Sequence, residues 1–145
     1  MKPFETLQQV LEFAIQEEQE AAAFYRALAA ATEDARLKEI LESFAREEQE
    51  HERKLNHVQI DGPQQLSDSL RKKLVEDPGA PEAPELGMDY PRLLELVIAK
   101  EMAAVRMYAA MAEDSDDAEM QALLNGLAEE EARHREAFEK ELAAL

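Results

Sequence analysis

The sequence predicts an all-α protein, a four-helix bundle made of two helical hairpins that a long crossover joins. Three observations predict this fold class. The chain of 145 residues is rich in good helix formers and has only four glycines. Apolar residues recur at spacings of three and four over four long segments. The stretch between the second and third segments is long enough to run the length of a bundle.

The first helix is predicted over about residues 4–30. Its inward stripe includes the polar residues Glu18 and Tyr25. Burying a carboxylate such as that of Glu18 without compensation is costly. The stripe is Phe4, Leu7, Leu11, Ala14, Glu18, Ala21, Tyr25 and Leu28.

The second helix is predicted to begin after Thr32, its expected N-cap, with Glu33 and Asp34 in the first turn. It is expected to reach about residue 59, because "DGP" at 61–63 breaks it. The inward stripe is Leu37, Leu41, Phe44, Glu48, His51, Leu55 and Val58.

The crossover is predicted over about residues 61–90. Within it "QQLSDSLRKKL" (64–74) is compatible with a short helix, whereas "DPGAPEAPELG" (77–87) is loop. Asp89 is the expected cap of the third helix, with Pro91 in its first turn. The inward stripe of that helix is Leu94, Val97, Glu101, Ala104, Tyr108 and Met111.

The fourth helix is expected to be capped by Ser115. Its inward stripe is Met120, Leu124, Leu127, Glu131, His134, Phe138 and Leu145. Short loops within each helix pair predict antiparallel hairpins over about 4–60 and 91–145. One crossover between two hairpins is the ferritin-like arrangement, here expected as a single domain over residues 1–145.

The two hairpins are copies of one sequence unit. Placing residues 18–58 on 101–141, an offset of 83, gives twelve identities in 41 positions. Composition explains some of the matched alanines and glutamates, but not two histidines and two tyrosines in register. The matched chemical groups are Glu18/Glu101, Tyr25/Tyr108, Glu48/Glu131 and His51/His134.

Each copy therefore provides one glutamate on its first helix and a Glu-x-x-His pair on one face of its second helix. Four carboxylates and two imidazoles on inward stripes are the donor set of dinuclear ferritin-like proteins. Two divalent ions would balance four carboxylate charges. Mixed oxygen and nitrogen ligands favour iron, manganese or zinc. A metal-free polar core is the alternative. The predicted metal ligands are Glu18, Glu48, His51, Glu101, Glu131 and His134.

Tyr25 and Tyr108 lie two turns beyond the glutamates of the first and third helices. One interpretation makes them core aromatics whose hydroxyls find some partner. The other makes each hydroxyl a group that orients a ligand carboxylate. Both tyrosines are therefore candidate catalytic residues.

Composition narrows the classes of partner and site. The net charge is −17, which disfavours nucleic acid and anionic membrane surfaces. The absence of cysteine excludes disulfides and thiolate metal sites. No apolar run approaches the length of a membrane span, and the N-terminus lacks a signal region, so a cytoplasmic protein is expected.

The chain resembles the rubrerythrin family through "EQEAAAFY" (18–25), "EQEH" (48–51), "EMAAVRMY" (101–108) and "EARH" (131–134). The resemblance implies a di-iron site that hydrogen peroxide or dioxygen oxidises. It implies that Glu48 and Glu131 bridge the ions and that Glu18 and Glu101 are terminal ligands. His51 and His134 would each bind one ion, with Tyr25 and Tyr108 behind the ligands.

The chain departs from the family pattern in two ways. Without cysteine it cannot hold a rubredoxin-like iron, so electrons are expected from a separate donor protein. Rubrerythrins also carry an extra carboxylate on the third helix near the ligand glutamate, whereas here the neighbours of Glu101 one turn away on either side cannot bind metal, so the site is expected to be symmetric. They are Val97, Ile98, Ala104 and Val105.

Three functions remain open at this point: a di-iron oxidoreductase, an iron-binding or storage protein without turnover, and a bundle that metals only stabilise. A homodimer is also possible, because dimers are common in the resembled family.

Overall fold

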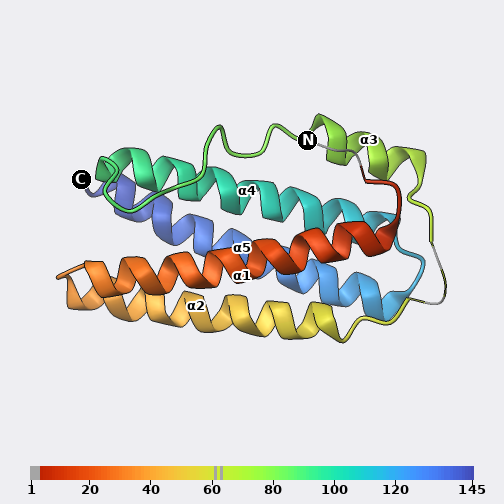
Figure 1. Ribbon diagram of the computed structural model, residues 1–145, viewed down its shortest axis with the longest axis horizontal. Helices are drawn as coiled ribbons and strands as arrows, with labels where there is room; N and C mark the ends of the chain where they lie inside the picture. Colours follow the sequence, from red (N-terminus) through yellow and green to blue (C-terminus); the bar gives the residue numbers. More distant parts are fainter. Residues whose placement is uncertain (1–3, 61, 63) are drawn as a thin grey trace. The chain divides into compact units, whose positions relative to one another are not determined.

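The computed structural model describes residues 4–60, 62 and 64–145. Its helices are α1 (Leu7–Ala31), α2 (Ala35–Asn56), α3 (Asp68–Glu76), α4 (Tyr90–Asp114) and α5 (Ala118–Ala143). Helix α1 packs against α2, and α4 packs against α5, with α3 between the two pairs in the sequence (Figure 1). This all-α chain of two hairpins is consistent with the ferritin-like four-helix bundle that the sequence predicts.

The chain divides into two compact units. One contains hairpin 1 (α1 and α2) and ends at Leu66; the other, Ser67–Leu145, contains α3 and hairpin 2 (α4 and α5). In the unit of hairpin 1, backbone hydrogen bonds join the start of the crossover to the residues at the beginning of α1. Leu7 N donates to Gln64 O (3.0 Å), and Leu66 N donates to Glu5 O (3.2 Å).

Helix α1 begins at Leu7, three residues later than the sequence predicts. Thr6 is its N-cap, and its hydroxyl accepts from Gln9 N (3.2 Å) while Gln9 Oε1 accepts from Thr6 N (3.1 Å). This reciprocal capping box satisfies two backbone donors and sets the helix start. Phe4 lies before the helix, with its ring centroid 5.3 Å from that of Phe13.

The predicted cap of α2 is wrong, because Asp34 takes that place instead of Thr32. The Asp34 carboxylate accepts from Arg36 N (3.0 Å) and Leu37 N (3.2 Å). Thr32 ends α1, and its hydroxyl accepts from Asp34 N (3.2 Å). A carboxylate next to the first turn is favoured because it also meets the positive end of the helix dipole. Helix α2 ends at Asn56, earlier than predicted.

The same correction applies to hairpin 2. Asp117 caps α5 by accepting from Glu119 N (3.0 Å), whereas Ser115 Oγ accepts from Asp117 N (3.2 Å). The two hairpin loops thus repeat one hydroxyl-then-carboxylate device. Helix α4 starts after Asp89 with Pro91 in its first turn, as predicted, but the Asp89 side chain makes no capping hydrogen bond.

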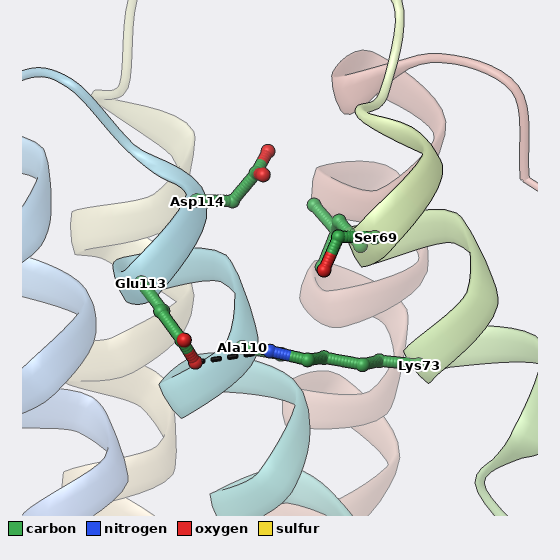
Figure 2. A pocket seen from close by; sticks show the side chains of 6 residues that line it. Ser69, Lys73, Ala110, Glu113 and Asp114 are labelled. Atoms are coloured by element: carbon green, nitrogen blue, oxygen red, sulfur yellow. Dashed lines mark hydrogen bonds and ion pairs between the residues drawn. The ribbon is translucent and has the colours of Figure 1, made fainter.

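The short helix α3 is held against α4 within the second unit. Leu70 and Leu74 are buried. Ser67 caps α3 and also donates to Asp114, and Lys73 Nζ lies 3.0 Å from Glu113 Oε2. Figure 2 shows Lys73 reaching across to Glu113. Both residues line a small polar hollow of about 130 Å³.

The predicted apolar stripes are largely buried, with one clear error. Leu145 is 65% exposed, because α5 ends at Ala143. Some fully buried residues lie beside the predicted stripes, among them Val10 and Leu96. No helix among the described residues combines the length and the apolar character that crossing a membrane requires.

Candidate metal centre

Hairpin 1 brings together three of the predicted ligands, here named the N-terminal triad: Glu18 from α1, and Glu48 and His51 from α2. All three are at most 3% exposed. His51 Nδ1 lies 3.4 Å from Glu18 Oε2 and 3.5 Å from Glu48 Oε1. The i, i+3 spacing places Glu48 beside His51, and helix packing within the hairpin adds Glu18.

Hairpin 2 forms the corresponding C-terminal triad of Glu101 from α4, and Glu131 and His134 from α5. These residues are also at most 3% exposed. His134 Nδ1 lies 4.0 Å from Glu101 Oε2 and 3.8 Å from Glu131 Oε2. The sequence repeat is therefore a repeat of three-dimensional structure, with somewhat longer distances in the second copy.

Buried polar side chains are concentrated in the two triads. Within the part of the chain that the structure describes, the buried polar or charged residues are the six members of the two triads. Taking a carboxylate out of water costs several kcal/mol even after relaxation. Four such groups in one small chain therefore indicate a compensating charge, and bound cations can supply it.

The donor set and its dimensions fit a metal ion in each hairpin. Within each triad the ligand atoms lie within 4.8 Å of one another. Two ligand atoms about 2.1 Å from an ion are roughly 3.0–3.4 Å apart at right or tetrahedral angles. Carboxylate oxygen with imidazole nitrogen suits iron, manganese or zinc. Each buried triad thus suits one metal ion.

Comparison with protein-family models matches residues 9–142 to the rubrerythrin family. The chain belongs to the rubrerythrin family. Neither the curated proteins nor the solved structures include a match to it. The matched residues include both triads, so the family match and the buried donor sets lie in the same part of the chain.

Both candidate tyrosines are buried in this rubrerythrin-family chain. Tyr25 is 2% exposed and Tyr108 is 0% exposed. The ring of Tyr25 packs edge-on against Phe44, with centroids 6.3 Å apart. That contact agrees with a role in the core, and a role of the hydroxyls in orienting ligands stays a prediction.

One contact near the N-terminal triad was not anticipated from the sequence. Gln19 Nε2 donates to Glu52 Oε2 at 2.7 Å, which joins α1 to α2. Gln19 follows Glu18, and Glu52 follows His51, so this hydrogen bond lies one residue beyond the triad on both helices. Two exposed polar residues in a helical sequence give no signal that they meet.

The other ionisable groups of α2 are exposed or half-buried, and none of them is fully buried. Glu50 pairs with Arg53, and this hydrogen bond lowers the pKa of the Glu50 carboxyl. His57, which follows the last residue of α2, is exposed, and its Nδ1 donates to Arg53 O at 2.7 Å. Neither group contributes to the triads.

Proposed function

We propose that this protein binds two iron ions through the two triads and acts as a rubrerythrin-type oxidoreductase that uses hydrogen peroxide or dioxygen. The observation that carries the proposal is the matched pair of buried Glu, Glu and His triads, one in each hairpin. Family membership supports the choice of iron and of peroxide chemistry.

When bound, two ferrous ions would supply one electron each, enough to reduce H2O2 and two protons to two waters, or O2 and two protons to H2O2. The four carboxylates balance the charge of the two cations. Each histidine binds as neutral imidazole, so metal binding is favoured where the imidazole proton is already lost. Following the family resemblance, Glu48 and Glu131 are the proposed bridging carboxylates.

The electrons that return the irons to the ferrous state are proposed to come from another protein. These 145 residues contain no cysteine, so they cannot form a four-cysteine iron site of the rubredoxin kind. A separate electron-donor protein is therefore the proposed partner of this chain.

Metal content tests the binding part of the proposal. The protein is purified from iron-replete, anaerobic culture and analysed for metals beside the variant Glu48→Gln, Glu131→Gln. Its matched control is Glu42→Gln, Glu129→Gln, which removes exposed carboxylates from the same two helices. About two irons per chain are expected in the parent and control, with loss in the first variant. A parent free of transition metal contradicts the proposal.

Rapid mixing tests the redox part. Ferrous-loaded protein is mixed with H2O2 and, separately, with O2, while the absorbance of ferric iron is followed. Oxidation faster than that of the same iron concentration in buffer is expected with at least one oxidant. A rate equal to that of free iron would refute catalysis even if the metal content is correct.

Metal handling without turnover is the second candidate, and the net charge of −17 favours it because an acidic surface attracts cations. Two ions bound per chain without accelerated oxidation would establish this function. Many ions per chain would indicate storage instead.

A further inference from the structure

The two triads contain the same residue types but are held differently. In hairpin 1 the triad lies beside the hydrogen bond from Gln19 to Glu52, which joins α1 and α2 at 2.7 Å. A link between two helices restricts their sliding and rotation, and therefore the distance from Glu18 on one helix to His51 on the other. Pre-organisation of this kind reduces the cost of assembling a binding site.

Hairpin 2 cannot form the equivalent link. The repeat places Met102 where hairpin 1 has Gln19, and Arg135 where it has Glu52. A methionine side chain has no hydrogen-bond donor. Arg135 instead lies against its own helix, with Nε 3.1 Å from Glu139 Oε1. Met102 is 38% exposed.

The distances within the triads differ in the same direction. His51 is 3.4 and 3.5 Å from its two carboxylates, which is near the separation of ligands around one ion. His134 is 4.0 and 3.8 Å from its carboxylates. The C-terminal triad must therefore contract by a few tenths of an ångström, whereas the N-terminal triad is close to its binding geometry.

We propose that Gln19 and Glu52 are positioning residues that make the N-terminal triad the tighter of the two triads, so that the first divalent ion binds at Glu18, Glu48 and His51. This inference rests on the proposed function, because it requires that both triads bind metal. The second ion then enters the C-terminal triad with lower affinity.

Titration of the metal-free, full-length protein with Co²⁺ tests the order of binding. Calorimetry measures the affinity of each step, and the visible absorption of Co²⁺ reports its ligands. Two steps of unequal affinity are expected in the parent. His51→Ala is expected to remove the tight step and His134→Ala the weak one. Loss of the tight step in His134→Ala would overturn the inference.

The role of the link is tested by Gln19→Met, which places in hairpin 1 the residue type of hairpin 2 without changing charge. The first step is expected to weaken by about three- to tenfold, as for the loss of one hydrogen bond, and the second step to keep its affinity. Gln16→Met is the matched control. Gln16 donates to Glu20 within α1 (3.2 Å). Its replacement therefore removes a hydrogen bond of the same kind but leaves the contact between α1 and α2 intact.

The reverse exchange is expected to increase the affinity of a binding step, a result that misfolding of the variant could not produce. Met102→Gln with Arg135→Glu installs the link in hairpin 2 and is expected to tighten the second step. An unchanged first step in Gln19→Met, with circular dichroism matching the parent, would overturn the inference and leave the proposed function standing. Absence of Co²⁺ binding in the parent would overturn both.

Discussion

Single residues of the two triads show a conflict between the stability of the fold and the proposed metal binding. Glu101 is 3% exposed, although a buried carboxylate disfavours folding unless an interaction compensates its desolvation. Such a residue suits the proposed metal binding and disfavours the metal-free fold. The same argument applies to its counterpart Glu18 in hairpin 1.

Replacing Glu101 by leucine is expected to raise the melting temperature of the metal-free protein, because the buried charge is removed while most of the volume remains. The same variant is expected to lose the stabilisation that metal provides. Thermal unfolding with and without Co²⁺ measures both effects. Glu95→Leu, an exposed position on α4, is the control and is expected to do neither.

At the scale of the helices, the two hairpin loops show how neighbouring cap candidates divide their roles. Thr32 and Ser115 each end one helix and accept from the backbone N–H of the following aspartate. The aspartates Asp34 and Asp117 then cap the next helix. Both residue types favour caps, so only the path of the chain decides which one is used.

Asp34→Ala and Asp117→Ala are each expected to reduce the free energy of unfolding by about 0.5–2 kcal/mol, the usual effect of losing an N-cap. Chemical denaturation of the metal-free protein measures this. Thr32→Ala tests the alternative cap. A larger loss in Thr32→Ala than in Asp34→Ala would contradict the assignment.

The segment after α3 is attached to α4 by an ion pair with a defined pH dependence. Arg106 donates to both carboxylate oxygens of Asp77 (2.7 and 3.0 Å), and this pairing lowers the pKa of the Asp77 carboxyl. Because the pKa of Asp77 is lower in the folded than in the unfolded protein, the ion pair stabilises the folded state at pH values above the unfolded pKa of about 3.9. This stabilisation is lost as the pH falls below that value.

Asp77→Asn is therefore expected to lower the stability of the metal-free protein at pH 7. The effect should be at most about 1 kcal/mol, since Arg106 is 42% exposed. The difference from the parent should shrink as the pH falls below about 3.9. Denaturation at a series of pH values measures this, and a difference that grows on acidification would refute the assignment.

At the scale of the whole molecule, the net charge favours the proposed metal binding. The chain has 33 acidic and 16 basic residues, so its charges repel one another at neutral pH. Cations bound in both triads would reduce this repulsion and favour the folded state over the unfolded one.

Removal of metal by a chelator is expected to lower the melting temperature in a way that depends on metal concentration. Free metal at about 100 times its dissociation constant stabilises by about 2.7 kcal/mol. Differential scanning calorimetry across a metal series measures this. An unchanged melting temperature in Glu48→Gln, Glu131→Gln upon metal addition is the expected control result.

Sequence patterns alone were enough to predict the all-α class, the two hairpins and the six residues of the triads. These features depend on short-range geometry, because the period of a helix places Glu48 beside His51 whatever surrounds it. The repeat extends the same reasoning to Glu131 and His134. Exact helix ends were less predictable, because adjacent residues such as Thr32 and Asp34 compete for the same backbone donors.

Only the tertiary structure decided how alike the two halves are. The repeat shows two equal triads, whereas the distances within them differ and only hairpin 1 has the Gln19–Glu52 link. That contact joins residues 33 positions apart in the chain. It depends on how α1 and α2 pack, which the sequence of either helix does not specify, because many exposed polar pairs are compatible with the same apolar stripe.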